Sequence, residues 1–195
     1  MLFRSIHRGD VFTTAATLGP IGISGYVLVI SNEHYNGIAG MPEEFDGELD
    51  STVRNVKNLL LNEYNSGVVV FEHGPRIGEH SGGTCIDHTH LHFVPTNINL
   101  VKILSDLFDF VFSSQSKFSS YNDLREILRR NESSYLFIED QKNRRFILET
   151  AISLPSQFLR RVIAFGEGRD DWDYAVYPER DLMYETVKRL RRNIE

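Results

Sequence analysis

The sequence holds one cysteine among 195 residues, Cys85, which excludes a disulfide framework or a cysteine-rich zinc module within one chain. It also lacks any apolar run of the roughly 18–20 residues that a membrane span needs. Basic residues are fewer than acidic residues: the chain has 21 Lys and Arg and 27 Asp and Glu, which give a net charge of −6. This balance argues against binding along a nucleic-acid polymer, which needs a basic face, yet it permits a small nucleotide in a pocket.

The first ten residues do not read as a signal peptide. They carry Arg4, Arg8 and Asp10 where a signal peptide would need an apolar core. Together with the single cysteine, this predicts a cytoplasmic, reducing compartment and no membrane partner. Hydrophobic residues make up 41% and charged residues 25% of the chain, which is typical of a globular protein with a sizeable core.

The apolar pattern predicts an α+β chain whose strands pair antiparallel, because the connections are too short for helical crossovers. Strands are expected at 11–17, 26–30, 68–71, 85–95, 135–139 and 146–152. Helices are expected at 45–64 and 100–112, from 120, over 155–166 and from about 179. A serine-rich stretch at 113–120 is the only plausible domain boundary in the sequence. We therefore expect a catalytic domain over 1–112 and an extension over 113–195 packed on it.

Three histidines alternate within the expected strand that ends at Pro95. Because side chains on a strand alternate between its faces, His88, His90 and His92 are predicted to share one face about 6–7 Å apart. Imidazole acts as a nucleophile, a base or a metal ligand near neutral pH. The spacing therefore predicts a functional site on this face of the sheet.

Two kinds of site fit these residues. In the first, the middle imidazole attacks phosphorus while the flanking ones orient the phosphate. In the second, His88, His90 and His92 bind a metal ion in a metal-dependent hydrolase or a metal-binding protein. Three alternate positions on one strand fit a single tetrahedral ion poorly, because the first and third lie far apart.

The segment His88-Thr89-His90-Leu91-His92-Phe93-Val94 resembles the His-φ-His-φ-His-φ-φ signature (φ, apolar) of the histidine-triad superfamily of nucleotide hydrolases and transferases. The preceding segment, 82–87, resembles that family's Gly-Gly loop, and 25–35 resembles its "Gly-His strand, then Lys-His-Tyr" passage. The likeness covers roughly residues 11–96. Residues 133–195 resemble a C-terminal extension of some members. The resemblance implies a histidine-triad-like antiparallel sheet with flanking helices and a C-terminal α/β extension.

The resemblance also implies roles for individual residues. His90 would be the nucleophile at a nucleotide α-phosphate, forming a nucleotidyl-histidine that water then hydrolyses. His92 would donate to a phosphate oxygen, and His88 would support the geometry. The backbone at Gly83, Thr84 and Cys85 would cradle the anion. No cofactor is implied, the partner is a small nucleotide or nucleotide conjugate, and a homodimer is expected.

Several positions depart from the family pattern. Tyr26 stands where members carry a fourth histidine; its phenol can hydrogen-bond to His88 but cannot act as a second imidazole, and we expect Tyr26 among the substrate-binding residues. Cys85 replaces the hydroxyl or amide that often meets the leaving group. Glu72 falls where an amide often contacts phosphate, and a carboxylate there would repel it. Farther along the chain, three side chains could reach phosphate, although a solvated helix face is the plainer reading: Gln157, Arg160 and Arg161.

Overall fold

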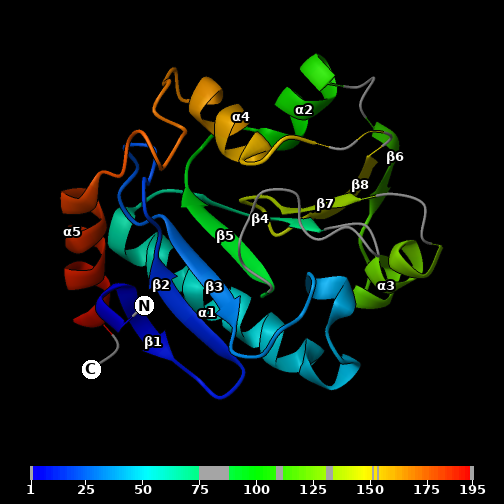
Figure 1. Cartoon of the computed structure of the whole chain (residues 1–195), viewed down its shortest axis with the longest axis horizontal. Coiled ribbons are helices and arrows are strands. Elements are labelled where there is room, and N and C mark those ends of the chain that lie inside the picture. The colour runs from blue at the N-terminus through cyan, green and yellow to red at the C-terminus, as the bar shows by residue number, and fades with distance from the viewer. Residues whose placement is uncertain are drawn as a thin grey trace.

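The computed structural model describes residues 2–74, 88–108, 112–130, 134–150, 152 and 154–193 of the chain (Figure 1). The strands are β1 (Ser5–Arg8), β2 (Phe12–Ala16), β3 (Val27–Ser31), β4 (Val68–Gly74), β5 (His90–Pro95), β6 (Phe112–Lys117), β7 (Tyr135–Glu139) and β8 (Arg145–Thr150). The α-helices are α1 (Asp46–Tyr64), α2 (Leu100–Phe108), α3 (Tyr121–Arg130), α4 (Phe158–Gly166) and α5 (Arg180–Arg191). Short 3-10 turns lie at Leu2–Arg4, Ile38–Gly40 and Glu43–Phe45.

All eight strands form one sheet in the order β1-β2-β3-β5-β4-β7-β8-β6, and every neighbouring pair is antiparallel. The expected α+β class is therefore confirmed. Strand β5 lies in the middle, with Leu28 of β3 and Phe71 of β4 both opposite His92. The apolar runs of β3 and β4 are buried along most of their length, as befits strands covered on both faces.

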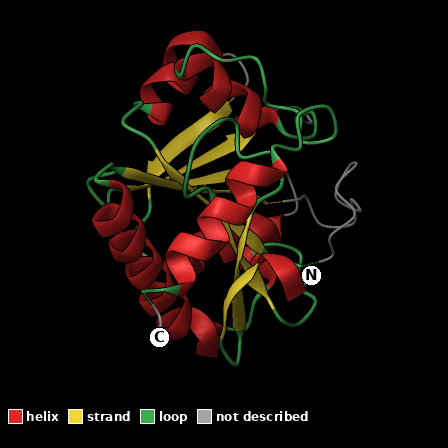
Figure 2. Cartoon of the chain, turned by 90° about the vertical axis from the view of Figure 1, so that its left-hand side faces the viewer, coloured by secondary structure: helices red, strands yellow, loops and turns green. Residues whose placement is uncertain are grey.

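Helices cover both faces of the sheet and give it two cores (Figure 2). On one face, α1 packs residues such as Leu49, Val53 and Leu60 against Leu91 and Phe93 of β5. On the other face, α2 and α4 pack against Phe71 and Val94. Because β5 alternates, its histidines share the second face, which places the site on the side of α2 and α4.

The C-terminal half extends the same sheet. Strand β7 pairs with β4 from Val70↔Glu139 to Gly74↔Tyr135, and β6 then forms the far edge by pairing with β8. The serine-rich stretch, which we expected to be a domain boundary, supplies most of strand β6. That strand crosses the expected boundary between residues 112 and 113. The division into 1–112 and 113–195 stays a prediction.

Two further expectations are corrected, and one strand was not expected. Helix α2 ends at Phe108 rather than at residue 112, because Phe112 belongs to β6. Strand β5 begins at His90, so His88 precedes the strand. Strand β1 was not expected, because its four residues include only one apolar side chain, Ile6, and it forms by pairing with β2.

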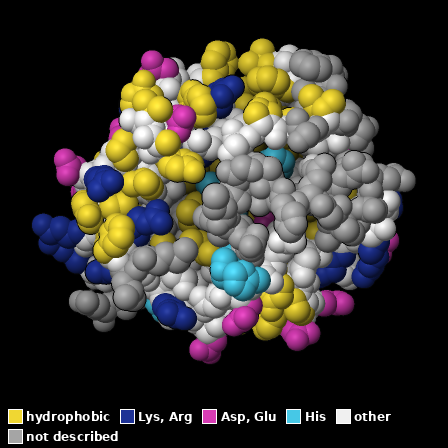
Figure 3. Space-filling view, in the orientation of Figure 1, with side chains coloured by type: hydrophobic (Ala, Val, Ile, Leu, Met, Phe, Trp, Pro, Cys, Tyr) yellow, Lys and Arg dark blue, Asp and Glu magenta, His cyan; other side chains and the backbone are white. Residues whose placement is uncertain are grey.

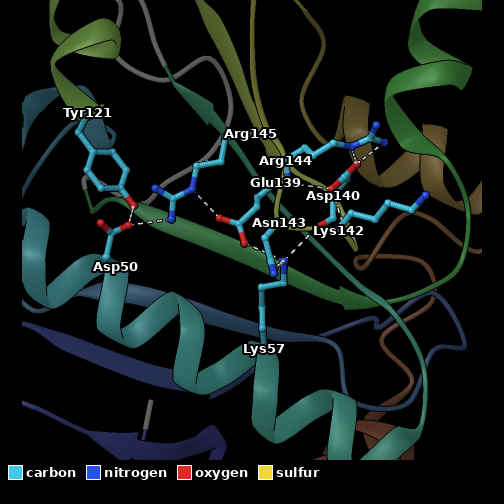
Figure 4. Close-up of polar contacts among 9 residues, drawn as sticks. All are labelled: Asp50, Lys57, Tyr121, Glu139, Asp140, Lys142, Asn143, Arg144 and Arg145. Atoms are coloured by element: carbon cyan, nitrogen blue, oxygen red, sulfur yellow. Dashed lines mark hydrogen bonds and ion pairs between the residues drawn. The ribbon is translucent and has the colours of Figure 1, made fainter. Parts of the chain in front are cut away.

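A network of ion pairs joins the β7–β8 hairpin to α1 (Figure 4). The ammonium of Lys57 lies 2.7 Å from Oε1 of Glu139 and 2.7 Å from Oδ1 of Asn143. Arg145 donates to the other oxygen of Glu139 and to Asp50 of α1, each at 2.7 Å. These charges are buried or half-buried, so each depends on its partner for the solvation that it loses.

Among the described residues, no helix is both long and apolar enough to span a bilayer. The longest of them, α1, has an apolar stripe that faces the sheet, and its remaining surface is mostly polar, with Leu61 exposed.

Candidate active site

His90 and His92 lie side by side on the same face of β5. Their ring centroids are 5.2 Å apart and their planes meet at 61°. Leu91 and Phe93 point into the opposite core, as the alternation predicts, and hold the strand in place from behind. Both residues are half-buried.

The Nδ1 of His90 lies 3.0 Å from the carbonyl oxygen of His88. A carbonyl only accepts, so Nδ1 carries the proton and Nε2 keeps its lone pair. Burial lowers the pKa of His90, and this outweighs the hydrogen bond to the His88 carbonyl, which raises the pKa; the nearby charge of His88 lowers it. The ring is therefore neutral at neutral pH and offers an available nitrogen nucleophile.

His92 is enclosed on two sides. Its ring stacks on Phe71 with centroids 4.5 Å apart and planes 5° apart, and its Nδ1 lies 2.7 Å from the hydroxyl of Tyr26. Burial lowers its pKa well below the ordinary value, and the charges of His90, Arg160 and His73 act in the same direction. His92 is therefore held neutral and in one orientation.

His88 turns toward the end of β3. Its Nδ1 lies 2.8 Å from the carbonyl oxygen of Ser31 and 3.0 Å from that of Glu33, and its ring lies 4.2 Å from the ring of His34. Of the three histidines, only His90 and His92 are brought together by a ring contact. His88 acts on the pair through its carbonyl, which accepts from His90.

The phenol of Tyr26, which can hydrogen-bond to His88 by its place in the motif, lies instead against His92. Tyr26 is fully buried, and its contact with substrate stays a prediction. The register explains the difference. Leu28 is opposite His92 and Ile30 is opposite His90, so Tyr26 lies beyond His92 at the end of β5 away from His88. Gly25 allows this entry into β3 with a φ of 83°, since a Cβ there would lie 2.4 Å from the ring of Tyr64.

Arg160 is buried rather than on a solvated helix face. Its guanidinium carbon lies 5.3 Å from the centroid of the Tyr26 ring, beside the end of the histidine pair. Arg161 instead packs over Trp172, with a 4.0 Å distance to the ring centroid, and Gln157 bonds to Arg160 and Asp173. Nothing in the local sequence separates Arg160 from Arg161 except the helical period, which puts Arg160 on the face of α4 that packs against the sheet.

Glu72 does not face the site. Phe71 stacks on His92, so its neighbour Glu72 points to the opposite face of β4, where it accepts from the Ile38 amide and the Tyr135 hydroxyl. The expectation that its carboxylate would repel a bound phosphate is wrong. His73 shares the site face and acts on the pKa of His92.

The expected phosphate cradle, Gly83, Thr84 and Cys85, lies outside the described residues. Their proposed contacts stay predictions. On the face seen in Figure 3, histidine side chains reach the surface near the middle of the molecule.

A metal ion would need several ligands around one point. Within the described ranges there is no group of three or more His, Cys, Asp or Glu residues placed to hold one. The Nδ1 atoms of His88 and His90 face carbonyl oxygens and that of His92 faces a phenol, so those nitrogens are occupied by hydrogen bonds.

No family model matches this chain, and no curated protein matches it. Among solved structures, a Hit-like protein involved in cell-cycle regulation from Bartonella henselae is 14% identical, with a TM-score of 0.40 over 49% of this chain and 70% of that one. A hypothetical histidine triad nucleotide-binding protein from Sulfolobus tokodaii is 21% identical, with a TM-score of 0.39 over 66% of this chain and 82% of that one. Yeast Ap4A phosphorylase Apa2, solved with Ap4A, is 11% identical, with a TM-score of 0.40 over 94% and 74%.

Two of these structures are described as Hit-like or histidine triad proteins. With TM-scores of 0.39 to 0.40, all three likenesses are partial.

Proposed function

We propose that the protein hydrolyses or transfers a nucleotide at its α-phosphate through a covalent intermediate on His90. In the first step Nε2 of His90 attacks the α-phosphorus, a P–N bond forms, and the bond to the leaving group breaks. The leaving group departs with the bonding pair and takes a proton from solvent. In the second step water or another acceptor attacks the phosphorus, so that the nucleotide is released and His90 is regenerated.

The observation that carries this proposal is the hydrogen bond between Nδ1 of His90 and the carbonyl oxygen of His88. It supports an attacking nitrogen that is unprotonated and oriented, and the lowered pKa of His90 keeps it so at neutral pH. A neutral nucleophile also approaches an anionic phosphate without first losing a proton.

His92 is proposed to donate from Nε2 to a non-bridging phosphate oxygen. Its ring is next to that of His90 and is held by Phe71 and Tyr26. The backbone at Gly83, Thr84 and Cys85 is proposed to bind the same phosphate. Suitable substrates are a nucleoside phosphoramidate, a dinucleoside polyphosphate or a related conjugate, and we propose a cytoplasmic homodimer as the working form.

The test is turnover of a fluorogenic adenosine phosphoramidate. We expect His90→Ala to lower turnover by several orders of magnitude. His92→Ala should lower kcat less, by about 10²–10³-fold, because one phosphate donor is lost. His7→Ala is the matched control, because His7 is exposed on β1 at one edge of the sheet. Near-normal turnover by His90→Ala would contradict the proposal.

A further inference from the structure

Tyr26 lies between His92 and a buried arginine. The tyrosine is 0% exposed, its hydroxyl is 2.7 Å from Nδ1 of His92, and the guanidinium of Arg160 packs against its ring. The tyrosine directly precedes β3 and the arginine comes from α4, so two distant segments meet at the end of the histidine pair.

The direction of the hydrogen bond between Tyr26 and His92 follows from the donors and acceptors present. In the part of the chain that the structure describes, Nδ1 of His92 is the one acceptor recorded for the Tyr26 hydroxyl. Arg160 offers donors only, so it cannot take the phenol proton. A buried O–H without an acceptor is costly, and the phenol therefore donates to His92.

This direction determines where His92 keeps its own proton. A neutral imidazole has one N–H, and when Nδ1 accepts from Tyr26 that proton is on Nε2. Burial and the positive charges around His92 disfavour the doubly protonated ring. His90 is in the opposite state, because its Nδ1 donates to the carbonyl of His88 and its Nε2 is free of a proton.

We propose that Tyr26 and Arg160 are positioning residues that hold His92 in its Nε2–H form, so that a phosphate donor stands beside the unprotonated Nε2 of His90. Without the phenol, Nδ1 of His92 is free to carry the proton, and Nε2 would then lack the hydrogen that a phosphate oxygen needs. The functional meaning of this arrangement rests on the function proposed above, whereas the tautomer of His92 can be measured without any substrate.

The surroundings of Arg160 fit this role. Its Nε lies 3.1 Å from the carbonyl oxygen of Trp172 and 3.2 Å from Oε1 of Gln157, and it also donates to the carbonyl of Gly19. Of the ion pairs found among the described residues, none involves Arg160. Its charge is held by these oxygen acceptors, lowers the pKa of the nearby Asp173 carboxyl, and also acts on Tyr26 and His92.

The first experiment reads the tautomer directly. Long-range ¹H–¹⁵N spectra of the ¹⁵N-histidine-labelled protein distinguish Nε2–H from Nδ1–H, and His92→Gln identifies the His92 signals by their loss. We expect His92 as Nε2–H and His90 as Nδ1–H in the unchanged protein. A proton on Nδ1 of His92 would overturn the proposal whether or not the protein turns over a nucleotide.

The second experiment removes the phenol. In Tyr26→Phe, we expect His92 to lose its single tautomer and kcat to fall about tenfold, with KM changed less than about twofold. Tyr135→Phe is the matched control, because Tyr135 is an equally buried phenol that bonds to Glu72 on the other face of the sheet. An unchanged His92 tautomer in Tyr26→Phe would overturn the proposal. An altered tautomer with no turnover by either protein would leave the positioning intact and contradict the proposed function instead.

The third experiment separates the charge of Arg160 from its packing. Because that charge lowers the pKa of His92, Arg160→Gln should raise the His92 titration midpoint, and Arg160→Lys should leave it low. Equal midpoints in both variants would contradict a role for the charge. If Arg160→Gln fails to give a dispersed spectrum, the tautomer in the unchanged protein and in Tyr26→Phe still decides the proposal.

Discussion

Glu72 is a carboxyl group enclosed on the sheet face opposite the histidines. Its oxygens accept from the Ile38 amide at 3.0 and 3.1 Å and from the Tyr135 hydroxyl at 2.7 Å. These bonds lower its pKa, but burial is the larger effect and raises the pKa to about 7. Between its ordinary pKa of 4.5 and 7, the folded protein holds a proton that the unfolded chain has lost, so stability falls as pH rises through this window.

We therefore expect Glu72→Gln to flatten this loss of stability. The amide cannot ionise, so the free energy of unfolding should fall less between pH 4.5 and 7, by up to about 3 kcal/mol. Urea unfolding at several pH values measures it. Glu48→Gln, which changes an exposed carboxyl on α1, is the control and should leave the slope unchanged. The same slope in Glu72→Gln and the unchanged protein would contradict the assignment.

His90 sets the pH dependence of the proposed reaction. Its neutral form is the nucleophile, and burial lowers its pKa below the ordinary 6.5. Because protonation removes the nucleophile, we expect kcat/KM for a phosphoramidate to stay level as pH falls from neutral to 6.5 and to drop only below it. A fall in kcat/KM at acidic pH with its midpoint above 6.5 would contradict a pKa of His90 that is lowered by burial.

At the scale of elements, the β7–β8 hairpin is tied to α1 by buried charges. Lys57 meets Glu139 and Asn143, so removing its ammonium leaves the Glu139 carboxylate short of a partner. We expect Lys57→Ala to lower the free energy of unfolding by about 2 kcal/mol, with Arg145 compensating in part.

Thermal unfolding checks the Lys57 prediction. A loss of about 2 kcal/mol corresponds to a fall in Tm of roughly 4–8 °C for a chain of this size. Lys102→Ala is the matched control, because Lys102 forms an exposed i,i+4 pair with Asp106 on α2 and should cost under about 1 kcal/mol. Equal falls in Tm for the two variants would show that the buried network adds no more to the free energy of unfolding than an exposed ion pair.

The elements also show what the sequence reveals and what it does not. Helix α1 was predicted because Leu49, Val53 and Leu60 repeat at the helical period, and β4 because it is a short apolar run. Strands β1 and β6 were missed because they are short or serine-rich and form through pairing with β2 and β8. Pairing energy of this kind comes from distant segments and leaves no local pattern.

The site, too, could be predicted only where a single segment carries it. The alternation of His88, His90 and His92 gave the residues and the shared face of the last two. The partner of Tyr26 depends on the register of β3 against β5, and the burial of Arg160 depends on how α4 packs. Neither is encoded within a single segment, so the pair formed by Tyr26 and Arg160 became visible only in the folded chain.

At the scale of the whole molecule, the continuous sheet bears on the proposed division into 1–112 and 113–195. Strand β7 pairs with β4 in the interior of the sheet, so a fragment ending at residue 112 would expose the edge of β4 and much of the core around Phe71. We expect that fragment to lack a cooperative thermal transition by circular dichroism. A fragment that unfolds cooperatively would contradict this expectation and support an independent catalytic domain.

Metal dependence is a second property of the whole protein. In the proposed reaction, imidazoles and backbone N–H groups meet the phosphate charge, so we expect turnover to survive prolonged chelator treatment. Elemental analysis should find well below one zinc per chain. Stoichiometric zinc whose removal abolishes turnover would favour the alternative of a metal site at the three histidines.

The most direct test of the proposed function is the covalent intermediate itself. The protein is mixed rapidly with a nucleoside phosphoramidate, quenched without acid to preserve the P–N bond, and analysed by intact mass and peptide mapping. We predict one nucleotidyl adduct per chain, located on His90, in the unchanged protein and in His7→Ala, and none in His90→Ala. Turnover without an adduct on the peptide that carries His90, or an adduct that persists in His90→Ala, would contradict the account.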